Sequence, residues 1–286
     1  MSKTLRLIAP DWQAGAKEDY YFGSQMLSML APKSDNQIER TVSVAAPTGA
    51  ELREENGVVE QSATFANVTN AKKIIADEQP DRIITLGGNC LVSQAPFDYL
   101  HGKYGNKLCV IWFDAHPDVS SPKMFNHEHA MVLANLLQQG DPALHCLTDH
   151  PFQPQDILYM GLQPLTEEEV PQMEKLGLSY VIQKESMLSR EDILAWMQKG
   201  GYTKIALHWD LDVISPTDYH SLYFNEPDVP MFAGSSCGHF KFVEIVNKLL
   251  EIQDMADIVG FTIAEYLPWD AIRLRKALSQ MSIFQA

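Results

Sequence analysis

Two short segments of the sequence place carboxylate and imidazole side chains at the spacing of a metal site. Asp114, His116 and Asp118 occupy alternate positions in VIWFDAHPDV, and Asp210 and Asp212 repeat that spacing in HWDLD. Residues at i, i+2 and i+4 of an extended chain project to one face. Aspartates gathered without cations would repel one another, which raises their pKa values and destabilises the fold. We therefore expect divalent cations among these side chains, and two in preference to one.

This set of donor atoms favours certain ions and one kind of chemistry. Oxygen-rich ligation with one or two imidazoles suits Mn²⁺ or Mg²⁺, although Zn²⁺, Fe²⁺ and Co²⁺ also accept such ligands. Two ions about 3.5–4 Å apart share a water and lower its pKa toward neutrality, so that hydroxide can attack an electrophilic carbon. A DxD pair alone more often marks a turn or a helix cap, so the prediction depends on both segments together.

The surrounding pattern predicts a parallel sheet with helices between its strands. Several apolar runs are continuous, as in strands buried on both faces. The alternation of strands and helices predicts one domain over residues 1–286, with a three-layer α/β/α architecture and an eight-stranded, mainly parallel sheet. The predicted strands are 4–9, 40–46, 81–86, 108–113, 156–161, 178–183, 204–209 and 257–264, and the predicted helices are 61–78, 127–139, 188–199, 239–254 and 269–283.

Chemically active residues follow four of these strands. GGNC, which ends in Cys90, comes after 81–86, and Glu265 comes after 257–264. The two aspartate segments follow the strands 108–113 and 204–209. Ligands bind beyond the carboxyl ends of the strands in open parallel sheets. We therefore expect five carboxylates, a histidine and a cysteine on one rim.

Composition excludes several classes of partner. The 286 residues include 22 Lys and Arg against 37 Asp and Glu, a formal charge of −15. This balance argues against nucleic acid, whose binding needs cationic side chains, and it attracts small cations. Neither a membrane span of about 20 apolar residues nor a secretory signal is recognisable, which predicts no membrane partner and a cytoplasmic location. The four scattered cysteines form no CxxC, so reduced thiols are expected.

The order of five motifs resembles one family of enzymes. GGNC, FDAHPD, NHEHAM, HWDLD and AEYLP are similar in order and spacing to motifs of the arginase, agmatinase and formiminoglutamase family, the ureohydrolases. The resemblance implies an arginase-like α/β/α fold, a binuclear manganese centre and hydrolysis of a guanidino or related amidine group. The implied partner is a small cationic guanidino or amidine substrate. Members often form trimers or hexamers, which implies a homo-oligomer.

The resemblance also implies a ligand set for each ion. Cys90 stands where the family has a metal-binding histidine. One ion would be held by Cys90, Asp114, Asp118 and Asp210, and the other by Asp114, His116, Asp210 and Asp212.

Three residues match catalytic positions of the family. His129 matches a histidine that relays protons and protonates the leaving amine, a role typically worth about 10²–10⁴-fold in rate. Glu265 matches the carboxylate that clamps the cationic guanidinium. Asp118 is expected to serve catalysis as well as metal binding.

The substrate loops differ from those of a true arginase. Ser120 stands where arginases have an Asn that grips the amino-acid carboxylate, and Thr166 lies near the position of an Asp that grips the α-amino group. L-Arginine is therefore a doubtful substrate. Ser120, Thr166 and Glu265 are the predicted substrate contacts.

Cys90 leaves other interpretations open. A thiolate prefers softer ions than Mn²⁺, so one site can be weak or altered in its preference. Alternatively, Cys90 is only a small buried residue in the GG turn. A mononuclear zinc amide hydrolase, like the histone deacetylases, shares the fold but leaves Asp118 and Asp212 without a clear role. A third reading is a catalytically inactive metal- or ligand-binding protein.

Overall fold

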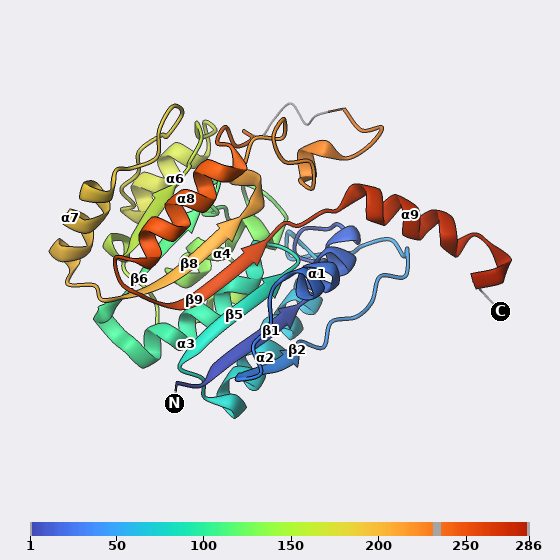
Figure 1. Cartoon of the computed structure of the whole chain (residues 1–286), viewed down its shortest axis with the longest axis horizontal. Helices are drawn as coiled ribbons and strands as arrows, with labels where there is room; N and C mark the ends of the chain where they lie inside the picture. Colours follow the sequence, from blue (N-terminus) through green and yellow to red (C-terminus); the bar gives the residue numbers. More distant parts are fainter. Residues whose placement is uncertain (1, 231–235, 285–286) are drawn as a thin grey trace.

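A parallel β-sheet forms the centre of the molecule (Figure 1). The structure is a computed structural model that describes residues 2–230 and 236–284. Every pair of neighbouring strands in the main sheet is parallel, as the sequence predicted. Across the sheet the strands are β2 (Gln37–Thr41), β1 (Thr4–Ala9), β5 (Arg82–Gly87), β9 (Asp257–Ala264), β8 (Lys204–Asp210), β6 (Leu108–Phe113) and β7 (Ile157–Met160).

The main sheet has seven strands in the described part of the chain, instead of the eight expected. The segment 178–183 is not a strand, although its apolar residues suggested one. The Gln183 side chain binds the end of β7 instead, because its Nε2 donates to Tyr159 O at 2.9 Å and its Oε1 accepts from Gly161 N at 3.2 Å. These side-chain bonds replace the backbone ladder that an added strand would need. A separate antiparallel pair is formed by β3 (Glu54–Glu55) and β4 (Val58–Val59).

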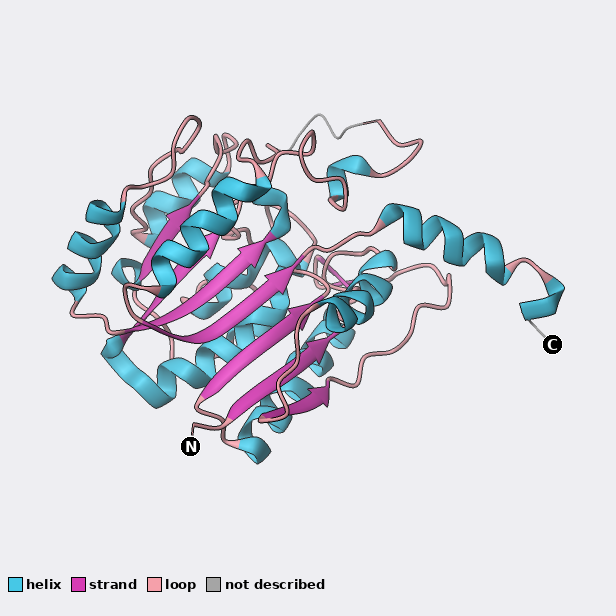
Figure 2. Ribbon diagram, in the orientation of Figure 1, coloured by secondary structure: helices cyan, strands magenta, loops and turns pink. Residues whose placement is uncertain are grey.

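Helices cover both faces of the sheet (Figure 2). Side chains of β6 alternate between two hydrophobic clusters, with Val110 and Trp112 in one and Ile111 and Phe113 in the other. The first cluster includes residues of α2, α3, α4, α5 and α6, and the second includes residues of α1, α7 and α8. The helices are α1 (Asp19–Leu30), α2 (Gln61–Glu78), α3 (Gln94–Tyr104), α4 (Val132–Leu136), α5 (Pro142–His145), α6 (Glu169–Leu176), α7 (Arg190–Gly200), α8 (Phe242–Gln253) and α9 (Trp269–Ser279).

The ends of several predicted helices differ from expectation. The helix expected over 127–139 is a 3₁₀ turn, η3 (Glu128–Met131), followed by the short α4.

The helix α9 extends away from the sheet (Figure 1), and its first turn is anchored by Trp269 and Ile272 in a small cluster with Trp12 and Tyr20. Within residues 2–230 and 236–284, no helix combines the length and apolar character that crossing a membrane requires.

Candidate metal centre

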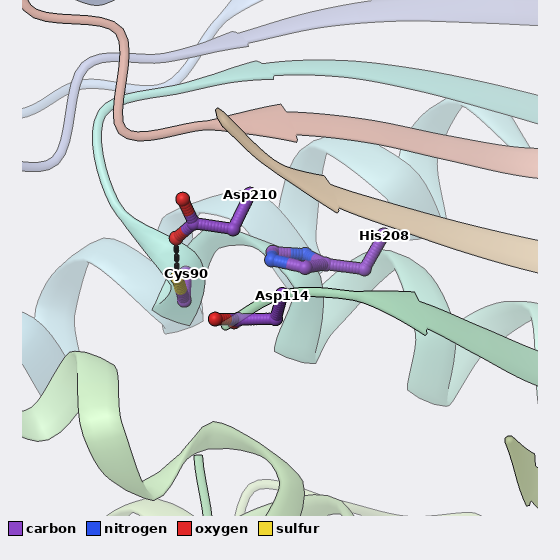
Figure 3. A group of neighbouring side chains, drawn as sticks. All are labelled: Cys90, Asp114, His208 and Asp210. Carbon is purple, nitrogen blue, oxygen red and sulfur yellow. Dashed lines mark hydrogen bonds between the residues drawn. The ribbon is translucent and has the colours of Figure 1, made fainter. Parts of the chain in front are cut away.

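Four neighbouring strands direct the predicted ligands to one end of the sheet. The strands β5, β9, β8 and β6 lie side by side, although they are far apart in sequence. Asp114 and Glu265 directly follow β6 and β9, Asp210 ends β8, and Cys90 begins η1 (Cys90–Ser93) three residues after β5. The side chains of Cys90, Asp114 and Asp210 point toward one another, together with that of His208 (Figure 3).

Two overlapping groups of side chains have the composition and proximity of cation sites. The ligand atoms of each group lie within 4.8 Å of one another, and Asp114 belongs to both groups. A shared carboxylate is the arrangement that two adjacent ions need. One group is Cys90, Asp114, His208 and Asp210, and the other is Asp114, His116 and Asp212.

Asp118 and His208 differ from their expected places. The sequence predicted Asp118 as a ligand; it lies outside both groups, but it is buried and its carboxyl interacts with the Cys90 thiol. His208 was not predicted, yet it belongs to the first group. Its position two residues before Asp210 on β8 could have indicated this, because alternate residues of a strand share a face.

Hydrogen bonds fix the orientation of the carboxylates. Asp114 Oδ1 accepts from His116 N at 2.6 Å, and Asp114 Oδ2 accepts from Trp112 Nε1 at 3.0 Å. Asp210 Oδ1 accepts from Asp212 N at 2.6 Å, while the Cys90 thiol donates to Asp210 Oδ2 at 2.8 Å. The donor atoms are therefore held in place by the protein before any ligand binds.

Burial and mutual repulsion raise the pKa values of Asp114, Asp210 and Asp118. Loss of water, reinforced by the charge of Asp212, raises the pKa of Asp114 from 3.8 to about 6. The pKa of Asp210 rises well above its usual range, mainly through burial and then through the charges of Asp212 and Asp114. Burial also raises the pKa of Asp118, and the charge of Asp114 adds to the effect.

One imidazole compensates part of this charge. Burial alone would lower the pKa of His116, but the attraction of Asp212 and the bond to Asp114 outweigh it and raise that pKa well above 6.5. His116 Nδ1 lies 3.0 Å from Asp212 Oδ2. Burial raises the pKa of Asp212, but the attraction of His116 and the hydrogen bonds that Asp212 accepts together outweigh burial and lower this pKa. Among the described residues, no Lys or Arg forms an ion pair with these four aspartates.

The site fits divalent cations. Asp118 Oδ2 and His208 Nε2 are buried and have no hydrogen-bond partner within the described chain. Unsatisfied buried polar atoms are rare and need an explanation such as an ion. Four buried carboxyl groups surround one imidazole, and carboxylate oxygens are donors that hard cations prefer. The donor set and the unpaired atoms both match this class of ligand.

A cavity of about 630 Å³ opens beside the cluster, which is large enough for a small metabolite. His129, Glu265, Ser120 and Thr166 all line it, so the catalytic and substrate residues predicted from the sequence face the same space as the candidate ligands. Its wall includes Cys90, His116, Asp210 and Asp212 from the two candidate metal groups, and Asp118, which lies outside both groups.

Glu265 is a buried glutamate on the cavity wall. Its Oε2 accepts a hydrogen bond from Tyr20, whereas Oε1 has no partner in the described structure. Burial raises the pKa of this carboxyl well above its usual range, and the charge of Lys17 lowers it only in part. The backbone of Glu265 has φ 65, and that of Asp118 has φ 50. Such strained conformations outside glycine are concentrated at functional sites.

His129 is held in one orientation on the cavity wall. Its Nδ1 lies 3.0 Å from Ala14 O, so the Nδ1 proton is donated to that carbonyl. Burial lowers the pKa of His129 to about 4, which leaves the imidazole neutral near pH 7. Its ring packs edge-on against Phe125, with centroids 6.1 Å apart. A neutral imidazole with one nitrogen engaged has the other available for proton transfer.

Ser120 and Thr166, two of the three predicted substrate contacts, differ in burial. Ser120 is buried, and its backbone N donates to Ala130 O at 2.8 Å. Thr166 is exposed, and its hydroxyl accepts from Glu169 N at 3.3 Å where α6 begins. Thr166 therefore helps to cap a helix as well as lining the cavity. The sequence did not single out Lys17, which lines the same cavity.

A parallel α/β sheet with carboxylates and histidines converging at its carboxyl edge defines a class of metal-dependent proteins. The chain belongs to one such family: the sequence model described as the Arginase family matches residues 26–222. The mitochondrial arginase of Medicago truncatula is 26% identical over 208 residues, which are 71% of this chain and 54% of that protein. The arginase of Entamoeba histolytica is 24% identical over 163 residues, 55% of this chain and 53% of that protein. The chain thus spans about half the length of the curated relatives it matches.

Solved structures show the same fold. The Entamoeba histolytica arginase in complex with L-ornithine has a TM-score of 0.75 at 19% identity, covering 94% of this chain and 92% of that one. A putative agmatinase from Clostridium difficile has a TM-score of 0.63 at 18% identity, covering 97% and 92%. The formimidoylglutamase of Bacillus subtilis has a TM-score of 0.64 at 12% identity, covering 93% and 79%. The fold is therefore shared by proteins named for three different substrates.

Proposed function

We propose that this protein is a metal-dependent hydrolase that cleaves a C–N bond of a guanidino compound or a related linear amidine. The observation that carries the proposal is the convergence of Asp114, His116, Asp210 and Asp212 beside a cavity that also contains Glu265. The surplus of buried carboxylate matches two divalent cations, which we take to be Mn²⁺ or a softer substitute. When bound, such ions would lower the pKa of a water molecule and stabilise the charge that develops on the substrate during its attack.

The remaining chemistry belongs to the residues on the cavity wall. Glu265 presents an unpaired Oε1 to a buried space, so that a cationic amidinium bound there would satisfy both the charge and the hydrogen-bonding capacity of the carboxylate. This pairing orients the substrate carbon toward the aspartates. His129, which is neutral with Nδ1 engaged by Ala14 O, has Nε2 available to pass a proton to the leaving amine.

The substrate is proposed to be a small cation other than L-arginine. Ser120 and Thr166 supply hydroxyls where an arginase would present an amide and a carboxylate, and the hydroxyl of Thr166 already binds the start of α6. Hydroxyls hold an α-amino-acid head group less strongly than charged groups do. Hydrolysis of a guanidino compound would release urea, and hydrolysis of a formimino compound would release formamide.

The test is a substrate panel assayed with protein loaded with Mn²⁺, Zn²⁺, Fe²⁺ or Co²⁺, after removal of metal with a chelator. Guanidino, formimino and acylamino compounds are compared, and urea, formamide and free amine are measured. Glu265→Gln should abolish most turnover. Its matched control is Glu128→Gln, which changes a buried glutamate that does not line the cavity and should leave turnover intact.

Three results would contradict the proposal. Turnover of acylamino compounds alone by a protein with one bound ion would indicate a deacetylase-like enzyme. Stoichiometric metal binding without turnover of any compound would indicate an inactive binding protein. Equal activity of Glu265→Gln and Glu128→Gln would show that the Glu265 carboxylate does not bind the substrate.

A further inference from the structure

His208 is a buried histidine in the strand that also carries Asp210. Its side chain is 0% exposed and lies in β8, two residues before Asp210. The residues on either side, Leu207 and Trp209, belong to the hydrophobic cluster on one face of the sheet. His208 and Asp210 therefore lie on the other face, because strand side chains alternate. Figure 3 shows the imidazole directed toward Cys90 and Asp114.

The contacts of the His208 ring leave one nitrogen unused. Its Nδ1 lies 2.8 Å from Ser93 Oγ, and the ring stacks on Trp112 with centroids 3.6 Å apart. Nε2 is buried and lacks a hydrogen-bond partner within the described chain. If Nδ1 donates its proton to Ser93, the Nε2 lone pair is free to bind a cation. Metal-binding histidines usually have such a partner on the other nitrogen.

The donor atoms around Nε2 are close enough for a single ion. Those of His208, Cys90, Asp114 and Asp210 all lie within 4.8 Å of one another. Ligands at about 2.0–2.3 Å from one ion are separated by at most about 4.5 Å, so small side-chain movements suffice.

We infer that His208 is a metal ligand, and that together with the Cys90 thiolate it gives one of the two cation sites a mixed sulfur, nitrogen and oxygen donor set. This inference deepens the proposed function and relies on its metal centre. Cys90 stands at the position where the family has a histidine. We infer that His208 on β8 contributes the imidazole instead, and that Cys90 contributes a thiolate. The second site keeps His116 and carboxylates only, so the two sites differ in chemistry.

The two sites should therefore prefer different ions. Thiolate and imidazole favour Zn²⁺, Fe²⁺ or Co²⁺, whereas the carboxylate-rich site also suits Mn²⁺. The Cys90 thiol must lose its proton when the ion binds, and the proton it donates to Asp210 at 2.8 Å is the one released. We expect the mixed site to take Zn²⁺ in preference to Mn²⁺ even when Mn²⁺ is in excess.

The direct test is X-ray absorption at the metal edge on wild-type protein loaded with two equivalents of Zn²⁺, together with Co²⁺ absorption spectra. The expected result is one sulfur ligand and two imidazoles for the two ions, with a thiolate-to-cobalt charge-transfer band. Detection of one imidazole only would overturn the assignment of His208, and this measurement does not depend on the folding of any variant.

Variants then separate a ligand from a residue that only supports the fold. His208→Phe keeps a ring against Trp112 but offers no donor atom, and it should weaken one Zn²⁺ site by more than about 100-fold. Ser93→Ala removes only the partner of Nδ1, for which a loss of about 10–100-fold is typical. The matched control is His101→Phe, because His101 also stacks on an aromatic ring, with its centroid 4.1 Å from that of Phe152, but lies outside the metal groups. Circular dichroism verifies that each variant is folded.

The outcomes distinguish this inference from the proposed function. Unchanged Zn²⁺ affinity and imidazole count in folded His208→Phe would overturn the inference even if the enzyme hydrolyses amidines. Two imidazoles and one sulfur in a protein that hydrolyses nothing would support the inference and contradict the proposed function. Equal weakening by His208→Phe and His101→Phe would show a general structural effect and would also overturn the inference.

Discussion

The metal-free protein should lose stability as pH rises through the range in which Asp114 ionises. Burial and the charge of Asp212 raise the pKa of this carboxyl from 3.8 to about 6. The folded state therefore holds the proton more tightly than the unfolded state. The stability that this proton contributes is fully present below about pH 4 and is lost as pH rises past 6. At about 1.4 kcal/mol per pKa unit, the loss is about 3 kcal/mol.

Asp114→Asn isolates this effect. The variant cannot ionise, so its free energy of unfolding should rise relative to wild type by about 3 kcal/mol between pH 4 and pH 7 in the presence of a chelator. Comparing the change with pH, rather than the absolute values, removes any constant effect of altered bonds to His116 and Trp112. Urea unfolding at a series of pH values measures the difference, which includes the loss of the Asp114 interactions that help to raise the pKa of His116.

Added metal should make wild type more stable than Asp114→Asn at pH 7, the reverse of the order expected without metal. Asp114 belongs to both candidate metal groups, so wild type at pH 7 gains more stability from Zn²⁺ or Mn²⁺ than Asp114→Asn does. A ligand at 100 times its Kd contributes about 2.7 kcal/mol. The control is Asp35→Asn, which lies in an exposed turn. It should change neither the pH dependence of stability in the chelator nor the stabilisation by added metal. A stability difference that stays constant or falls as pH rises in the chelated samples would refute the electrostatic reasoning.

Three further variants test the cavity and its support. His129→Ala should lower kcat by about 10²–10⁴-fold while elemental analysis finds the same metal content, and a loss of bound metal instead would contradict its role in proton transfer. Glu265→Gln should raise the urea midpoint of metal-free protein at pH 7, because the raised pKa of this buried carboxyl means that its ionisation opposes folding; a lower midpoint would count against that explanation. Gly88→Ala should destabilise the fold by at least about 1–3 kcal/mol in thermal or urea unfolding, since the new Cβ would lie 1.8 Å from Asp11 O; unchanged stability would contradict the close packing of this turn.

Much of the sheet could be predicted because its strands have locally readable patterns. The prediction for 108–113 is confirmed as β6, all six of whose residues are buried, and that for 257–264 is confirmed as β9. The segment 178–183 has a similar composition but is not a strand, because the Gln183 side chain binds the end of β7. The helix α1 (Asp19–Leu30) was not predicted, and Gly23 shows why. A Cβ there would lie 1.9 Å from Tyr266 O, so the helix depends on close packing against a segment distant in sequence.

The sequence by itself determined the family resemblance, the spacing of Asp114, His116 and Asp118, and the expectation that strand ends carry the site. These are short-range properties, because alternate residues of an extended chain share a face wherever the strand lies. The order of strands was decided only by the tertiary structure, which places β9 and β8 between β5 and β6. That order brings His208 to the Cys90 thiol and places Tyr20 against Glu265, contacts that link residues more than 100 positions apart. Whether a buried histidine is core or ligand depends on which atoms meet its free nitrogen, and the sequence does not specify those neighbours.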